Sequence, residues 1–131
     1  MAAAESYPED LKYHREHDWA RIDGEEAVLG ITWFAQDALG ELVHFEAPEA
    51  GATVTAGESY GEVESVKAVS DVISPLSGEV LEVNAAVVDA PETVNEDPYG
   101  EGWLIRIRMG DAAEADALLD LAAYREVLAE Q

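Results

Sequence analysis

The sequence predicts a mainly β fold of many short strands, with helices near the two ends of the chain, and three observations support this. Apolar and charged residues alternate over residues 103–109, as in a half-buried antiparallel strand. Two apolar segments flank an Asp-Gly turn signal within residues 19–31. Two Pro-x-x-Gly units, beginning at Pro48 and Pro75, indicate two similar strand–turn–strand halves that face each other.

The first elements follow from their turn residues. Residues 1–10 are expected to form a loose lead-in. Trp19–Ile22 and Ala27–Ile31 are expected to be strands joined at Asp23-Gly24, because Asp and Gly both tolerate a positive φ.

A helix cap predicts the next element. The Thr32 hydroxyl can accept from the first free amides of a short helix over residues 33–39, and Gly40 is placed to end it. Further strands are expected at residues 42–45, 60–65, 69–73, 80–83 and 103–109.

The pattern changes at the C-terminus, so residues 111–131 are expected to be a helical segment. Asp111-Ala-Ala-Glu114 resembles a capping box with Asp as the cap. The apolar residues that follow fit a helical stripe, which predicts one bent helix or two short ones over residues 112–129.

Composition limits the classes of function. The chain has 131 residues, 48% of them hydrophobic, which suits a single domain over residues 1–131. The absence of cysteine excludes disulfides and thiolate zinc sites. A formal net charge of -22 repels nucleic acid and anionic membrane surfaces. Because no signal peptide, transit peptide or apolar run of ~20 residues is visible, we expect a cytoplasmic protein. We also expect a monomer.

Lys67 is isolated from the other basic residues. From Ile22 to Ile105 the chain holds 18 Asp and Glu residues and no Arg, and Lys67 is its only lysine. The one other lysine in the sequence is Lys12. Lys67 is therefore either an incidental surface lysine or a single attachment point.

Local chemistry narrows the role of this lysine. A lysine that forms a Schiff base needs apolar burial or neighbouring cations, whereas Lys67 has Glu64 and Asp71 nearby. Lys67 is thus a poor catalytic nucleophile, but it suits acylation by an enzyme that recognises its setting, which would remove its charge. The flanking segments are expected to be paired strands, so that Lys67 projects from a hairpin tip.

The segment Glu64-Ser-Val-Lys-Ala-Val-Ser-Asp71 resembles the lipoylation site of the glycine cleavage system H protein family. The resemblance covers about residues 11 to 128. Its other matching segments, in the family's order, are Leu11–Tyr13, His17–Trp19, Gly30–Thr32, Ala35-Gln36, Leu39–Val43, Val94–Trp103 and Leu118–Tyr124. Trp33 and His44 depart from it, because the family often has Asp and an apolar residue there.

The resemblance implies a barrel–sandwich hybrid of two β-sheets and a carrier protein that is not an enzyme. It implies lipoate in amide linkage on Lys67, whose dithiolane accepts the aminomethyl group of glycine. The implied partners are a pyridoxal-phosphate-dependent glycine decarboxylase, a tetrahydrofolate-dependent aminomethyltransferase and dihydrolipoyl dehydrogenase. A lipoate ligase or a lipoyl/octanoyl transferase would attach the cofactor.

The resemblance also implies site residues. Asp71 and Asp18 match positions that line a cleft for the loaded arm, and Glu16 falls at a further cleft position. A protonated amine favours carboxylates within reach, although solvated surface acids are the alternative. The residues that an attaching enzyme would recognise around the lysine are Glu64, Ser65, Val66 and Ala68.

Other interpretations remain open. Other carriers are a lipoyl domain of a 2-oxo-acid dehydrogenase acyltransferase and a biotin carrier, which usually has Met on both sides of the lysine. A passive acidic binding module with an unmodified Lys67 belongs to a different class. Gly57-Glu-Ser-Tyr-Gly61 fits a serine hydrolase pattern, but a strand is expected after it and all three histidines precede it. His14 and His17 form only a weak metal pattern, so we expect no metal site.

Overall fold

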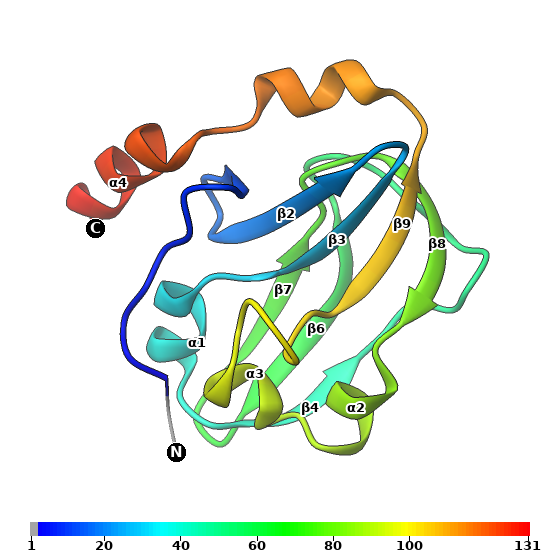
Figure 1. Ribbon diagram of the computed structural model, residues 1–131. Helices are drawn as coiled ribbons and strands as arrows, with labels where there is room; N and C mark the ends of the chain where they lie inside the picture. The colour runs from blue at the N-terminus through cyan, green and yellow to red at the C-terminus, as the bar shows by residue number, and fades with distance from the viewer. Residues whose placement is uncertain (1–2) are drawn as a thin grey trace.

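The computed structural model describes residues 3–131 and confirms the predicted mainly β fold with two antiparallel sheets (Figure 1). Sheet A has the strand order β1-β2-β3-β9-β8-β5 and sheet B the order β4-β6-β7. The strands are β1 Lys12–His14, β2 Asp18–Asp23, β3 Glu26–Ile31, β4 Leu42–Glu46, β5 Thr53–Val54, β6 Ser59–Ser65, β7 Val69–Ile73, β8 Gly78–Val83 and β9 Ile105–Met109. The helices are α1 Trp33–Leu39, α2 Ala85–Asp89, α3 Thr93–Glu96, the 3₁₀ helix η1 Ala112–Ala117 and α4 Leu121–Ala129.

The last strand, β9, lies at the centre of sheet A and shows the predicted alternation. Ile105 and Ile107 are fully buried, whereas Arg106 on the opposite face donates to Glu26 and Glu82. β9 pairs with β3 on one side and with β8 on the other.

The two Pro-x-x-Gly halves face each other, as predicted. Their strands β5 and β8 pair directly, with Thr53 opposite Glu79 and Val54 opposite Gly78. Gly78 also allows β9 to approach, because a Cβ there would lie 2.1 Å from the Arg108 carbonyl oxygen. The close pairing depends on glycine at this position.

Side-chain caps fix the helix ends. Thr32 accepts from the Ala35 amide and begins α1, and Gly40, with φ 87°, ends it as predicted. The C-terminal segment forms two short helices rather than one bent helix, since Leu118 is extended between η1 and α4. The predicted capping box is only half formed, because Asp111 caps η1 but the Glu114 carboxylate accepts from Ser77 instead.

The described residues form four elements for which the sequence predicted no range, namely β1, β5, α2 and α3. Asn84 begins α2 by accepting from the Ala86 amide, and its amide group donates to the Glu101 and Trp103 carbonyls. These helices are five and four residues long, which is too short for a helical period to show in the sequence. The two-residue turn between β2 and β3 is Gly24-Glu25, one residue later than predicted.

The lead-in is not loose over residues 3–10. The Ala3 amide donates to the Asn95 carbonyl, and the Trp33 indole donates to the Ala3 carbonyl. Tyr7 is 8% exposed and stacks edge-on against Tyr124. Residues 1–2, where the predicted lead-in begins, lie outside the described residues.

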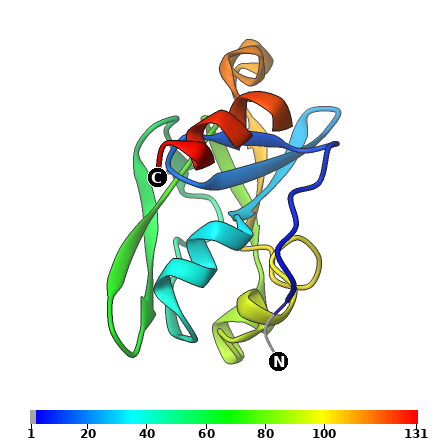
Figure 2. The same ribbon diagram turned by 90° about the vertical axis from the view of Figure 1, so that its left-hand side faces the viewer.

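Two apolar clusters hold these parts together. The main core lies between the sheets and includes Leu29, Phe45, Val63 and Ile107. A second cluster, which contains Tyr13, Trp19 and Tyr124, joins β1 and β2 to the N-terminal segment and α4 (Figure 2). Within residues 3–131, no helix has the length and hydropathy needed to span a membrane.

Candidate functional site

Lys67 lies at the bend of the β6–β7 hairpin and is exposed, as the sequence predicts. Its neighbours Glu64, Val66 and Ala68 are exposed as well, and Val66 is 80% exposed. An apolar side chain that is so open gains nothing by burial in the isolated chain. The bend therefore presents a lysine next to an exposed apolar side chain.

Ser65 holds this bend from beneath. It is 4% exposed, and its hydroxyl oxygen accepts from the Lys67 amide at 3.3 Å and from the Ala68 amide at 3.1 Å. The hydroxyl also donates to the Ala68 carbonyl, which in turn accepts from the Ser65 amide at 2.8 Å. One buried side chain thus bonds to three backbone polar groups of the bend.

Replacing Ser65 with alanine is expected to loosen the bend. The variant leaves two loop amides without their acceptor, which should lower the free energy of unfolding by about 1–2 kcal/mol. Hydrogen exchange at the Lys67 and Ala68 amides, followed by NMR, should become faster than in the parent protein. Ser6→Ala, a change at an exposed residue, is the control, and equal exchange in both variants would contradict the assigned role of Ser65.

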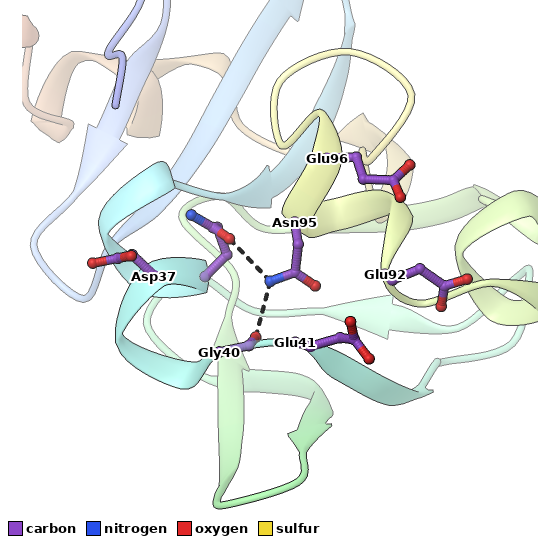
Figure 3. Close-up of a pocket in the computed structure, with 7 residues that line it drawn as sticks. Asp37, Gly40, Glu41, Glu92, Asn95 and Glu96 are labelled. Atoms are coloured by element: carbon purple, nitrogen blue, oxygen red, sulfur yellow. Dashed lines mark hydrogen bonds between the residues drawn. The ribbon is translucent and has the colours of Figure 1, made fainter. Parts of the chain in front are cut away.

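The stem of Lys67 passes the turn that joins α1 to β4. A Cβ placed on Gly40 would lie 3.6 Å from the Lys67 Cε, so the Lys67 side chain comes near this turn. Gly40 also lines a cavity of about 220 Å³ together with Asp37, Glu41, Glu92 and Glu96 (Figure 3). Asn95 holds its wall by donating to Gln36 and to the Gly40 carbonyl.

A larger cavity lies along β7. Its volume is about 510 Å³, and its lining includes the predicted residues Glu16 and Asp71. Val69, Asp71 and Ile73 alternate along β7 and all three line it, so one face of the strand leads from the lysine bend to the cavity. The structure therefore brings Asp71 and Glu16 together at this cavity, while Lys67 lies two residues before β7 and is not among the lining residues.

The remaining lining residues were not predicted as site residues. They are His14, Gly57, Val69, Ser70 and Ile73. His14 accepts from the Glu16 amide, and burial lowers the pKa of its imidazole. Ser59, in the β6 strand, donates to Asp71 at 3.4 Å. No local sequence motif marks these residues, because they meet only when β1 packs near β7.

Asp18 differs from its predicted place on the cleft surface. It is 2% exposed, and its Oδ2 has no hydrogen-bond partner among the described residues. Burial raises the pKa of Asp18 well above its usual value, although the Ile73 backbone amide opposes this and the Glu16 carboxylate adds to it. Asp18 thus lies beneath Ile73 and Glu16, which line the cavity, and is not solvated beside them.

The raised pKa of Asp18 predicts a pH-dependent loss of stability. The folded state binds the Asp18 proton more tightly than the unfolded state does. The stability that this proton binding provides is complete below the unfolded pKa of about 3.9 and is lost as the pH rises. Asp18→Asn should therefore gain stability relative to the parent as the pH rises from about 4 to 8. Urea unfolding across that range measures the difference.

Asp116→Asn is the control for this prediction, because it removes the same charge from an exposed position. If the two variants showed the same dependence on pH, repulsion between surface acids would explain the effect and the buried Asp18 would not.

Within residues 3–131, no group of three or more His, Cys, Asp and Glu side chains is arranged to hold a metal ion. Gly57–Gly61 enters the strand β6, and Tyr60 within it is buried. The strand–turn–helix context of a nucleophilic serine is therefore missing there.

The chain is similar to known proteins in sequence and in structure. The family described as Glycine cleavage H-protein matches residues 11–131. The chain belongs to this family. It is 55% identical over 124 residues to the glycine cleavage system H protein of Anaeromyxobacter sp. (strain K), which covers 95% of this chain and 97% of that protein. It is 54% identical over 125 residues to the H protein of Halorhodospira halophila, covering 95% and 96%.

A solved H protein supports the same assignment in three dimensions. The crystal structure of a glycine cleavage system H protein from Mycobacterium marinum matches with a TM-score of 0.84 and 43% identity, over 94% of this chain and 99% of that chain. H proteins are carriers and not enzymes, and they bear lipoate covalently attached to a lysine. Membership of the family implies interaction with other components of the glycine cleavage system.

Proposed function

We propose that Lys67 bears the lipoate and that the chain shuttles the aminomethyl group of glycine between the enzymes of glycine cleavage. The observation that supports this most is the exposed Lys67 on a bend held by the buried Ser65. The only other lysine, Lys12, is in β1 and pairs with Ala20 instead of lying on a bend. A single addressable amine is what an attached carrier arm requires.

The residues around Lys67 fit a long acyl arm. When bound, lipoate supplies a dithiolane that exchanges electrons and holds the one-carbon unit, and the protein supplies its placement. Asp71 is four residues beyond Lys67, or ~13 Å along a strand at ~3.3 Å per residue. The open face of β7 between them leaves a path to the cavity of about 510 Å³. An arm anchored at Lys67 would thus lie along β7 and end in this cavity.

The cavity suits a cargo with a primary amine. Glu16 and Asp71 line it, and Asp18 adds a buried acceptor atom that has no hydrogen-bond partner within residues 3–131. A protonated amine would be held by charge-assisted hydrogen bonds to such groups. We assign Glu16 and Asp71 to the rim and Asp18 to the interior of this proposed shelter.

The surface around Lys67 suits transient binding of several enzymes. Val66 is 80% and Val69 57% exposed, and Glu62 and Glu64 lie beside them on β6. Small apolar contacts rimmed by charge favour fast and reversible association. The proposed partners are the pyridoxal-phosphate-dependent decarboxylase, the tetrahydrofolate-dependent aminomethyltransferase, dihydrolipoyl dehydrogenase and the ligase or transferase that attaches lipoate. We further propose a single-domain monomer that works in the cytoplasm.

Reconstitution tests this function. The chain is treated with lipoate ligase, ATP and lipoate, and intact mass is expected to show one lipoyl adduct. The modified chain is then mixed with the three enzymes, glycine, tetrahydrofolate and NAD. NADH formation should depend on the modified chain and stop without it. A fully lipoylated chain that supports no NADH formation would contradict the proposed shuttle.

A further inference from the structure

His17 adopts a backbone conformation that residues with a side chain rarely take. Its φ is 73°, and no other non-glycine residue within residues 3–131 has a positive φ. Such a conformation persists only where the surroundings enforce it, and it often marks a functional segment. The His17 amide donates to the His14 carbonyl, and the His17 carbonyl accepts from the Thr32 amide. The side-chain contacts of His17 should therefore explain why the turn of residues 14–17 is strained.

The C-terminal helix α4, which lies against β1 (Figure 2), contacts the His17 ring at two points. The Tyr124 hydroxyl lies 2.8 Å from His17 Nδ1. The side chain of Gln131, which follows α4, also makes a hydrogen bond with the His17 ring, and its amide group donates to the Val127 carbonyl. Phe34 of α1 packs against the ring, with 4.4 Å between the centroids. The His17 ring is thus enclosed between α1 and α4.

The neighbours of Tyr124 fix the direction of these hydrogen bonds. The Thr32 hydroxyl is buried, its oxygen accepts from the Ala35 amide, and within residues 3–131 its only other partner is the Tyr124 hydroxyl at 2.8 Å. A hydroxyl has one hydrogen to donate, so Thr32 donates to Tyr124 and Tyr124 donates to His17 Nδ1. The proton of the neutral His17 ring is then on Nε2, which donates to the Gln131 side-chain oxygen. Both ring nitrogens are therefore bonded to the C-terminal segment.

The strained turn carries part of the cavity wall. His14 and Glu16 line the cavity of about 510 Å³, and the Glu16 amide donates to His14 Nδ1. His14 is the last residue of β1 and pairs with Asp18 at the start of β2, so both ends of the turn are anchored in sheet A. Glu16 has no such pairing, and its place depends on the φ of His17, the residue that follows it.

We propose that Tyr124 is a positioning residue that acts through His17 to hold the turn of residues 14–17 in its left-handed conformation, and so sets the place of Glu16 in the cavity wall. Only the use of the cavity rests on the proposed carrier function. Tyr124 is fully buried and stacks on Tyr13 of β1, with 4.6 Å between the ring centroids, so its hydroxyl is held rigidly. A helix near the C-terminus thereby determines the shape of a cavity that it does not line.

A role of Tyr124 in packing alone has different consequences. Its ring contacts Tyr13 face to face and Tyr7 edge-on, and phenylalanine would keep both contacts. Tyr124→Phe removes only the hydroxyl, which leaves His17 Nδ1 without its donor. If the ring alone mattered, this variant would leave Glu16 where it is.

Nitrogen-15 NMR of the unlipoylated protein tests the proposal. Tyr124→Phe should change the H–N–Cα–H coupling of His17, which reports φ, and should shift the Glu16 amide signal. In the background His17→Gly, Tyr124→Phe should no longer shift Glu16, because glycine adopts a positive φ without strain and has no ring to transmit the contact. An effect that passed through Thr32 and α1 instead would be equal in both backgrounds.

The tautomer of His17 gives a second, spectroscopic measurement. At pH about 8, where an ordinary histidine is neutral, the ring nitrogen signals of the parent should show a proton on Nε2 and none on Nδ1. Burial lowers the pKa of His17, although Gln131 and Glu16 oppose this. Tyr124→Phe should raise the pKa of His17, because the neutral ring loses the donor to its Nδ1.

Tyr7→Phe is the matched control. Tyr7 belongs to the same aromatic cluster, but its hydroxyl donates to Glu5, so its loss should leave the His17 pKa and the Glu16 signal unchanged. An unchanged Glu16 signal in Tyr124→Phe, or an equal shift in the His17→Gly background, would overturn the inference. None of these results bears on lipoylation of Lys67, which intact mass reports separately as the test of the carrier function.

Discussion

Lys67→Arg is expected to abolish lipoylation of this chain. Arginine retains the positive charge and a long stem, but its guanidinium stays protonated and does not form an amide with lipoate. Because Lys67 is the only lysine between Ile22 and Ile105, no neighbouring amine can replace it. Intact mass after treatment with lipoate ligase should show no adduct, and NADH formation in the reconstituted system should fall to background.

Lys12→Arg is the matched control, since it changes the one other lysine of the chain. It should leave one adduct, which peptide mapping should place on Lys67. Both variants change exposed side chains, so their free energies of unfolding should agree with the parent within about 0.5 kcal/mol. An adduct that persists in Lys67→Arg and maps to Lys12 would contradict the site assignment.

Gly61→Ala is expected to lower the free energy of unfolding by about 3 kcal/mol or more, as for severe overpacking. The added Cβ would lie 2.3 Å from the Glu46 carbonyl oxygen, and the β4–β6 pairing fixes both strands there. The clash is between backbone-anchored atoms, so no side-chain rotation can relieve it. Either β4 separates from β6, or β6 loses the bulge at Tyr60, where its register against β7 shifts.

Urea unfolding measures this effect. Gly110→Ala is the control, because the nearest atom to its new Cβ is the Ser77 carbonyl oxygen at 3.9 Å, an ordinary contact. That variant should change stability by no more than about 0.5 kcal/mol. If Gly61→Ala lowered the free energy of unfolding by less than about 1 kcal/mol, β4 would have moved to accommodate the added Cβ. The β4–β6 pairing would then be more deformable than the geometry indicates.

The strands and caps could be read from the sequence because their signals are local. The alternation in β9 follows directly from the pleat of a strand. The Thr32 cap and the Gly40 terminus involve atoms only a few residues apart. The helices within residues 85–96 could not be predicted in this way. α2 and α3 are held by Asn84 and Asn95, whose hydrogen-bond partners lie up to 59 residues away in the chain.

The isolation of Lys67 was likewise a property of the sequence alone, because composition and spacing require no coordinates. Its exposure at a hairpin bend followed from the two flanking strands. The resemblance to H proteins pointed to the family that the comparisons then confirmed. The burial of Ser65 beneath the bend needed the coordinates, since serine side chains are mostly exposed in folded proteins.

Only the tertiary structure decided which acids are buried. Glu16 and Asp18 are two residues apart and chemically alike, yet Glu16 lines an open cavity while Asp18 is enclosed beside Ile73. Tyr60 is buried against the alternation of its own strand. Burial depends on the packing of β2 from sheet A against β6 and β7 from sheet B. β2 ends at Asp23 and β6 begins at Ser59. Local periodicity determines each strand, but it does not reveal how strands so far apart in the chain meet.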